Sequence, residues 1–144
     1  MKYIHYGYER LDKSRIKPIK NEYMWHKPTG GLWASPVGAA MGWKEWCEQE
    51  EFMLERLETF CTFSVREDAH IYQINSKEDI DAMPKQSLQA PIRCDDAIDF
   101  EKMLADGVDA IQYNLSSNWR LQWVSNGWDC DSILIMNPTV IIDE

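Results

Sequence analysis

The sequence lacks long apolar runs and closely spaced cysteines, and each absence argues against a class of protein. No stretch approaches the roughly 20 apolar residues that span a bilayer, and the first residues carry no signal-peptide core. We therefore expect a cytoplasmic protein that does not enter a membrane. The cysteines are too far apart in sequence for a zinc or redox motif, so we expect reduced and mostly buried thiols at Cys47, Cys61, Cys94 and Cys130.

The common ligand-binding motifs are also missing. The chain has no GxGxxG after a strand, no phosphate loop, no HExxH and no GxSxG. Its three histidines, His5, His26 and His70, match no metal-ligand spacing. We predict no metal site.

Positive charge is scarce and unevenly placed. The chain has 15 Lys and Arg against 24 Asp and Glu, a net charge of −9. Residues 1–27 hold seven of these cations against three acids, and the remainder is strongly acidic. An acidic body argues against general binding to a nucleic-acid backbone. The basic N-terminal segment is either a site for a compact anion such as a diphosphate or a solvated loop.

Tryptophan is abundant, with seven in 144 residues. This composition favours an aromatic-lined cavity or an aromatic interface. The length fits one domain over residues 1–144 that can bury a core.

The hydrophobic patterns predict an α+β fold, with a mixed sheet of about six strands and three or four short helices. A charged turn at residues 66–68 separates two of the strands, and residues 84–95 read as an exposed connection. The strands are expected over residues 3–7, 32–35, 59–65, 69–74, 108–113 and 132–136, with a further short one at 140–142. The helices are expected over residues 42–58, 76–84, from Asp95 or Asp96 to Gly107, and from Ser116 or Ser117 to Asn126.

A double glycine precedes the strand at 32–35. Strand alternation places Trp33 and Ser35 on one face and Leu32 and Ala34 on the other. An indole beside a hydroxyl suits a pocket wall, and it equally suits an ordinary core strand. The glycines either allow a special backbone conformation or let a ligand come close.

Three carboxylates stand where catalysis is chemically reasonable. Glu50 falls on the apolar stripe of the helix expected at 42–58, so it is either paired in the core or directed into a cleft. Asp129 and Asp131 directly precede the apolar run at 132–136, as catalytic acids or as turn residues. A hydrolase built on these two aspartates would lack a positioned base or metal motif.

The order of segments is more informative than any single one. Ile-His-Tyr-Gly opens the chain, Gly-Gly-Leu-Trp-Ala-Ser follows, and Gly-Val-Asp-Ala-Ile and Trp-Asp-Cys-Asp-Ser-Ile-Leu-Ile come late. This order resembles the ADP-ribosyltransferase-like fold. Members of that fold place a histidine or arginine on the first strand, a serine or tyrosine motif on the second, and a glutamate on a late strand.

The resemblance implies an NAD site and a role for each residue. His5 would hold the adenine-side ribose, and Gly7 would offer backbone groups to the nicotinamide amide. Trp33 would stack near the nicotinamide, with Ser35 hydrogen-bonding nearby, and lysines of the N-terminal segment would approach the diphosphate. Asp131, with Asp129 as second candidate, would take the place of the glutamate.

Aspartate is one methylene shorter than glutamate, and a misplacement near 1 Å can cost ~100-fold in rate. The resemblance therefore leaves three outcomes: transfer of ADP-ribose to a macromolecular target, NAD binding without turnover, or loss of the ligand. Glu50 would substitute only if its helix borders the same cleft. A separate hypothesis is a non-enzymatic acidic domain whose tryptophans form a protein-binding surface.

Overall fold

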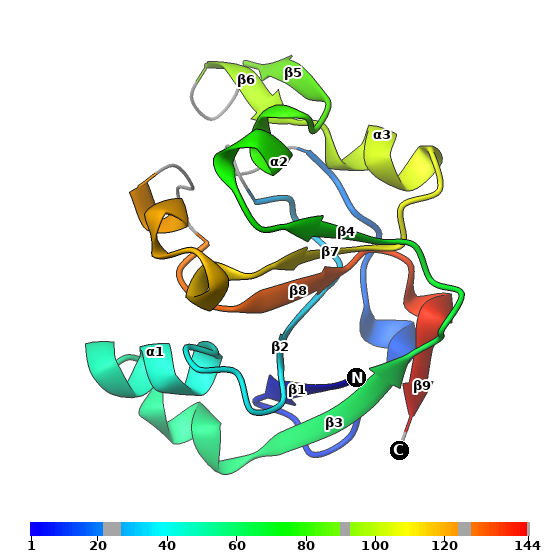
Figure 1. Cartoon of the computed structure of the whole chain (residues 1–144). Coiled ribbons are helices and arrows are strands. Elements are labelled where there is room, and N and C mark those ends of the chain that lie inside the picture. The colour runs from blue at the N-terminus through cyan, green and yellow to red at the C-terminus, as the bar shows by residue number, and fades with distance from the viewer. Residues whose placement is uncertain (22–26, 90–92, 124–127, 144) are drawn as a thin grey trace.

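A seven-stranded mixed sheet forms the centre of the chain (Figure 1). The computed structural model describes residues 1–21, 27–89, 93–123 and 128–143. Across the sheet the strands run in the order β4 (Ile71–Ile74), β7 (Ala110–Tyr113), β8 (Ser132–Ile135), β2 (Leu32–Pro36), β1 (Lys2–Tyr6), β3 (Phe60–Val65) and β9 (Ile141–Asp143). A separate antiparallel hairpin joins β5 (Lys85–Leu88) to β6 (Cys94–Ile98).

Short helices surround the sheet. Within the described residues the α-helices are α1 (Trp43–Glu50), α2 (Lys77–Asp81) and α3 (Phe100–Ala105). The 3₁₀ turns are η1 (Lys13–Arg15), η2 (Leu54–Glu58), η3 (Leu115–Ser117), η4 (Trp119–Trp123) and η5 (Pro138–Val140). The predicted α+β class is confirmed, and the described residues hold nine strands rather than about six. None of the described helices has the length and apolar character needed to cross a bilayer.

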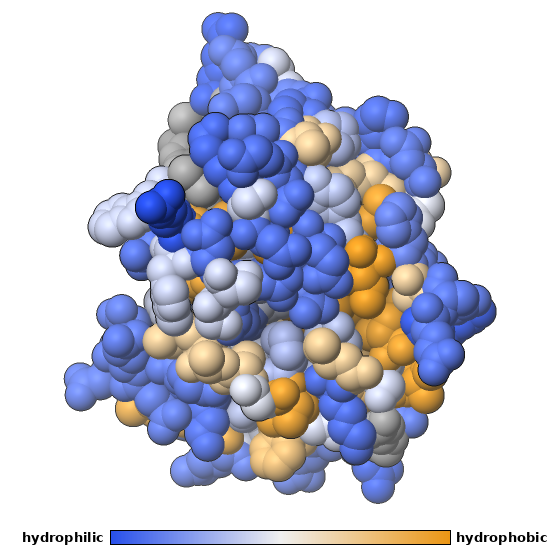
Figure 2. Space-filling model, in the orientation of Figure 1, coloured by the Kyte–Doolittle hydropathy of each residue, from blue (hydrophilic) through white to orange (hydrophobic). Residues whose placement is uncertain are grey.

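Strands β7 and β8 lie at the heart of the molecule. Every residue of both strands is buried, which confirms the prediction that the apolar run at 132–136 is covered on both faces. Ile133 and Ile135 pack into one core cluster, and Leu134 packs into the other on the opposite face. Hydrophilic residues cover most of the molecular face shown in Figure 2.

The sheet is weakly joined between β1 and β2. On one side β2 pairs with β8 over three residues, Leu32 to Ala34. On the other side it pairs with β1 only at Tyr3–Pro36 and Ile4–Ser35. Beyond Ile4 the two strands have no backbone pairing, so β1 continues beside β3 while β2 continues beside β8.

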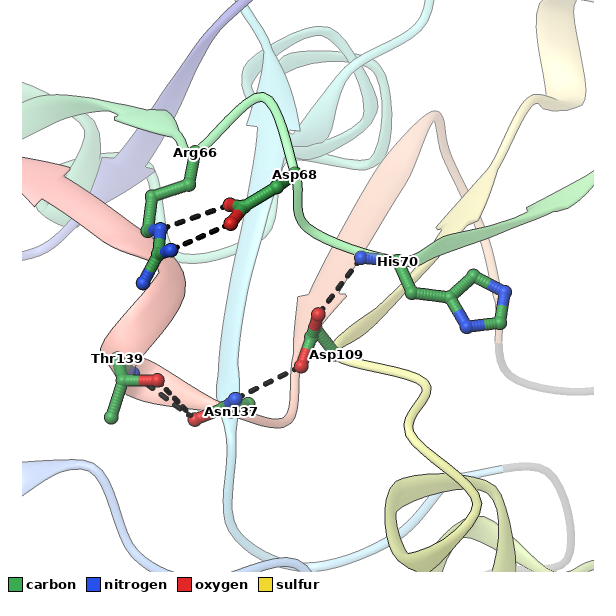
Figure 3. Close-up of polar contacts among 6 residues, drawn as sticks. All are labelled: Arg66, Asp68, His70, Asp109, Asn137 and Thr139. Atoms are coloured by element: carbon green, nitrogen blue, oxygen red, sulfur yellow. Dashed lines mark hydrogen bonds and ion pairs between the residues drawn. The ribbon is translucent and has the colours of Figure 1, made fainter.

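A polar corner ties one end of this sheet together (Figure 3). The Asp109 carboxylate accepts hydrogen bonds from the His70 backbone N–H at 2.8 Å and from Asn137 Nδ2 at 2.9 Å. These contacts join the segments that enter β4 and β7 to Asn137, two residues after β8. An ion pair of 2.6 Å between Arg66 and Asp68 lies in the predicted turn between β3 and β4.

The helix predicted over 42–58 is wrong in its length. Helix α1 ends at Glu50, because Glu51 takes a left-handed conformation with φ of 54°. Glu50 is exposed, so its expected place on a buried stripe is also wrong. The chain then reverses into η2 through Met53, which has φ of 50°. Neither position carries glycine, the usual signal for such a conformation.

The predicted connection at 84–95 is instead largely the β5–β6 hairpin, described on either side of residues 90–92. The helix that follows is capped by Asp99, whose carboxylate accepts from the Lys102 backbone N–H at 3.0 Å, and not by Asp95 or Asp96. Its end before Gly107 is as predicted.

The helix expected from Ser116 or Ser117 is two 3₁₀ turns. Leu115 is buried, whereas Trp119 and Trp123 are exposed. The expected stop at Asn126 lies outside the described residues. Buried free thiols are confirmed for Cys47, Cys61 and Cys130.

Candidate functional site

A cavity of about 300 Å³ opens where β1 and β2 lose their pairing. That volume is at the lower end of the range, about 300–1,000 Å³, typical of small-molecule sites. The wall combines aromatic rings, two cations and one carboxylate. Its lining residues are Ile4, His5, Tyr6, Lys27, Trp33, Ala34, Trp43, Arg56, Trp128, Asp129, Cys130 and Ser132.

His5 bridges the gap between the diverging strands. Its Nδ1 lies 2.6 Å from the carbonyl oxygen of Trp33. Because a carbonyl only accepts, Nδ1 carries the hydrogen and donates it. In the neutral ring this leaves Nε2 as an acceptor for a hydroxyl group. The ring also stacks on Tyr8 with centroids 5.8 Å apart, so its orientation is fixed from two sides.

Two tryptophans form the aromatic wall. Trp33 and Trp128 meet edge to face with ring centroids 4.8 Å apart. Trp128 is buried and also contacts Tyr113 at 5.4 Å, whereas Trp33 keeps partial exposure. Lys27 places its ammonium 5.8 Å from the Trp33 ring centre. The wall therefore offers an indole and a cation together.

The second cation, Arg56, comes from η2. The reversal at Glu51 and Met53 turns the chain after α1, and η2 brings Arg56 to the cavity. Sequence reasoning missed this residue because it continued the helix to residue 58. Lys27, by contrast, belongs to the basic N-terminal segment that was predicted as a candidate anion site.

The two neighbouring aspartates have opposite surroundings. Asp129 is exposed and lines the cavity. Asp131 is buried, and its carboxylate accepts from the Ser116 backbone N–H at 2.8 Å, from Ser116 Oγ at 2.6 Å and from the Met41 backbone N–H at 3.3 Å. Asp131 thus joins η3 to the loop before α1 and does not line the cavity.

Ser35, Gly7 and Glu50 also lie outside the lining. The Ser35 hydroxyl accepts from the Trp43 backbone N–H at 2.9 Å, at the start of α1. The Gly7 N–H donates to the Thr59 carbonyl at 2.9 Å. The exposed Glu50 ends α1. These contacts hold the elements around the cavity in place.

The double glycine before β2 has a conformational role. Gly31 has φ of 70°, and an added Cβ would lie 2.8 Å from the Leu134 side chain and 2.9 Å from that of Ile19. Of the two roles left open by the sequence, the structure supports a special backbone conformation under close packing.

Cys130 forms a neutral part of the wall. Its sulfur lies 3.3 Å from Ser132 Oγ, and burial raises the pKa of the thiol to about 11. Since the thiolate is the reactive form, Cys130 is a poor nucleophile at neutral pH.

A second cavity, of about 230 Å³, also borders His5. Arg10 and Arg15 add positive charge to it, although Arg15 contacts Asp12 at 3.5 Å. The full lining is His5, Tyr8, Arg10, Leu11, Asp12, Arg15, Ile16, Gly31 and Leu32.

The structure brings together His5, Trp33 and Asp129 from three distant parts of the chain. Sequence reasoning did not identify Trp43 or Trp128 as part of this site, although Trp128 directly precedes Asp129. Among the residues that the structure describes, which do not include His26, no cluster of His, Cys, Asp and Glu is suited to hold a metal ion. A scan against protein-family models and searches of curated proteins and solved structures found no match for this chain.

Proposed function

We propose that this chain is an ADP-ribosyltransferase-like protein that binds NAD in the cavity between β1 and β2. One observation carries the proposal: His5 and Trp33, which the motif order singled out, line the same cavity as Asp129, its second candidate for the acid. Their separation along the chain means that only the fold brings them together.

The chemistry of the wall suits a nucleotide. Stacking of a base on an aromatic side chain contributes about 1–3 kcal/mol, and Trp33 is partly exposed for such a contact. Lys27 and Arg56 provide charge-assisted hydrogen bonds to a diphosphate. With Nδ1 of His5 directed to the Trp33 carbonyl, its Nε2 atom is left to form a hydrogen bond with a ribose hydroxyl. The second cavity, with Arg10 and Arg15, adds room for the remainder of a dinucleotide.

NAD supplies a glycosidic bond to nicotinamide that a transferase breaks. The carboxylate that this cavity offers to the ribose is Asp129, whereas Asp131 is held by Ser116 and Met41. We therefore assign the acid's role to Asp129, ahead of Asp131. A carboxylate placed beside developing positive charge stabilises it.

Thermal unfolding tests the binding. At a free NAD concentration of about 100 Kd, the folded state gains about 2.7 kcal/mol, which raises Tm by about 5–10 °C for a domain of this size. Lys27→Glu and His5→Gln should each remove most of this shift. Trp123→Ala, at a side chain 81% exposed and outside the cavity, is the matched control and should keep it. An unchanged wild-type Tm in millimolar NAD disproves the proposal.

Nicotinamide release tests the chemistry separately. Asp129→Asn should lower the release rate at least ~100-fold, as expected for loss of one electrostatic contact in the transition state, while the NAD-induced Tm shift is retained. Asp131→Asn is informative only at temperatures where it is folded. If wild-type protein binds NAD and releases no nicotinamide with any protein target, the transferase part fails and the binding part stands.

A further inference from the structure

Exposed apolar side chains gather around η2. Four large ones lie within nine residues: Phe52, Met53, Leu54 and Phe60 are 42%, 39%, 45% and 52% exposed. We call these four residues the η2 patch. Large apolar groups concentrated in this way on a surface mark interaction sites more often than scattered ones do.

Ring contacts hold both ends of the η2 patch beside the cavity. Phe52 packs edge to face against Trp43 and Trp46, with centroids 6.2 Å and 5.6 Å apart. At the other end Phe60 contacts Tyr6 at 6.1 Å. Trp43 and Tyr6 both line the cavity, so the η2 patch contacts two residues of the cavity wall.

Backbone strain accompanies this exposure. Glu51 and Met53 both adopt left-handed φ values, 54° and 50°, on either side of Phe52. Such conformations cost free energy for residues with a Cβ, and they persist where the surrounding structure enforces them. The chain therefore holds Phe52 at the surface in a fixed place, which lowers the entropy cost of binding a partner.

The charge around the η2 patch is negative. Residues 43–58 contain six glutamates against Lys44 and Arg56. The five ion pairs that the structure gives within the described residues involve none of these glutamates, namely Glu45, Glu48, Glu50, Glu51, Glu55 and Glu58. Figure 2 shows mostly hydrophilic residues over α1, at the lower left.

We propose that the η2 patch docks a basic polypeptide segment that carries apolar anchor side chains. The aromatic and aliphatic groups supply the buried contact, and the glutamates select lysine and arginine over acidic partners. The same negative charge disfavours nucleic acid and anionic lipid. This docking does not depend on NAD binding, although a docked segment would contact side chains that pack against the cavity wall.

Fluorescence anisotropy of a labelled amphipathic peptide rich in lysine and leucine tests the proposal. Phe52→Ser combined with Leu54→Ser removes anchors, and Glu48→Lys combined with Glu55→Lys reverses charge. Each pair should weaken binding at least tenfold. The matched controls are Trp119→Ser with Trp123→Ser, and Glu67→Lys with Glu78→Lys, at exposed sites outside the η2 patch. Both controls should change Kd less than twofold.

Results of three kinds would overturn the proposal. The first is no wild-type binding, or equal binding of a peptide with glutamate in place of lysine. The second is an equal loss in the control pairs, or no loss from Phe52→Ser with Leu54→Ser, which would show unspecific attraction to an acidic protein. The third is a wild-type dimer in sedimentation equilibrium that this same pair dissociates, since the occupant would then be a second copy.

Folding and NAD binding are checked on the same proteins. If Phe52→Ser with Leu54→Ser does not show a cooperative melt, Phe60→Ser takes its place in the anchor test. The patch variants should keep the NAD-induced Tm shift, so failure of docking and failure of NAD binding are read independently.

Discussion

The two neighbours of strand β2 differ in how firmly they hold it. On the β8 side three residues pair, and every residue of β8 is buried. On the β1 side two residues pair, the strands then diverge, and a cavity lined by His5 and Trp33 takes the place of further backbone bonds. The firmly paired side contributes only Ser132 of β8 to the cavity wall, whereas the weakly paired side has both room and polar groups.

Asp129 and Asp131 show the same contrast within three residues. Asp131 is buried, and its carboxylate accepts hydrogen bonds from Ser116 and Met41. Asp129 is exposed and lines the cavity. Two similar acids in sequence are therefore a structural group and a candidate catalytic group.

Replacing each aspartate by alanine should give the largest effect. Asp131→Ala removes a buried carboxylate and leaves the partly buried donors of Ser116 and Met41 without their acceptor, so the free energy of unfolding should fall by about 3 kcal/mol. Asp129→Ala should change it by less than about 0.5 kcal/mol, as for other exposed sites. Urea denaturation measures both. Equal losses of stability would show that the two aspartates do not differ in their structural role.

Alkaline pH should lower the free energy of unfolding through the buried thiol of Cys130. The folded thiol has a pKa of about 11, against 9.0 for the free group, so above pH 9 the unfolded chain loses its proton first. Stability is then lost as pH rises, by about 2 kcal/mol at pH 11.

Other groups titrate in the same range, because burial also raises the pKa of Tyr3, Tyr6 and Tyr72. The measured quantity is therefore the difference between wild type and Cys130→Ala in urea denaturation at pH 8 and pH 11. A loss of equal size in both proteins would remove Cys130 as its cause.

The smallest expected effect is a gain in stability at the end of α1. Glu51→Gly relieves the left-handed strain at the end of α1, and we expect stabilisation by about 0.5 kcal/mol after the entropy cost of glycine. The opposite substitution, Gly31→Ala beside Leu134, should destabilise, because φ is 70° and its Cβ would lie 2.8 Å from that side chain. Differential scanning calorimetry measures both changes. A loss at Glu51→Gly would mean that the Glu51 side chain holds the reversal by contacts of its own.

Local signals were sufficient for much of the fold. Alternation located β2, the apolar run located β8, and the helix expected from residue 76 begins there as α2, where Ser76 accepts from the Asp79 backbone N–H. Each of these features depends on residues that are close in sequence, so a local sequence pattern predicts it.

The remainder depends on long-range or atypical features. The chain reverses at Glu51 and Met53 without a glycine, so the sequence carries no signal of the reversal. The sequence pattern therefore predicts Arg56 on a helix. The partners of Asp131 lie 15 and 90 residues away, at Ser116 and Met41, and no spacing rule links them. The motif order did identify His5, Trp33 and Asp129, but it ranked Asp131 ahead of the aspartate that lines the cavity.

The imidazole of His5 borders both cavities and is anchored to the Trp33 carbonyl. An elongated molecule that fills both spaces has to bend past this ring, while two compact molecules can occupy them side by side. In the proposed NAD complex the ring would therefore stand between the two parts of the dinucleotide, and a larger or smaller side chain at position 5 would change which ligand shapes fit.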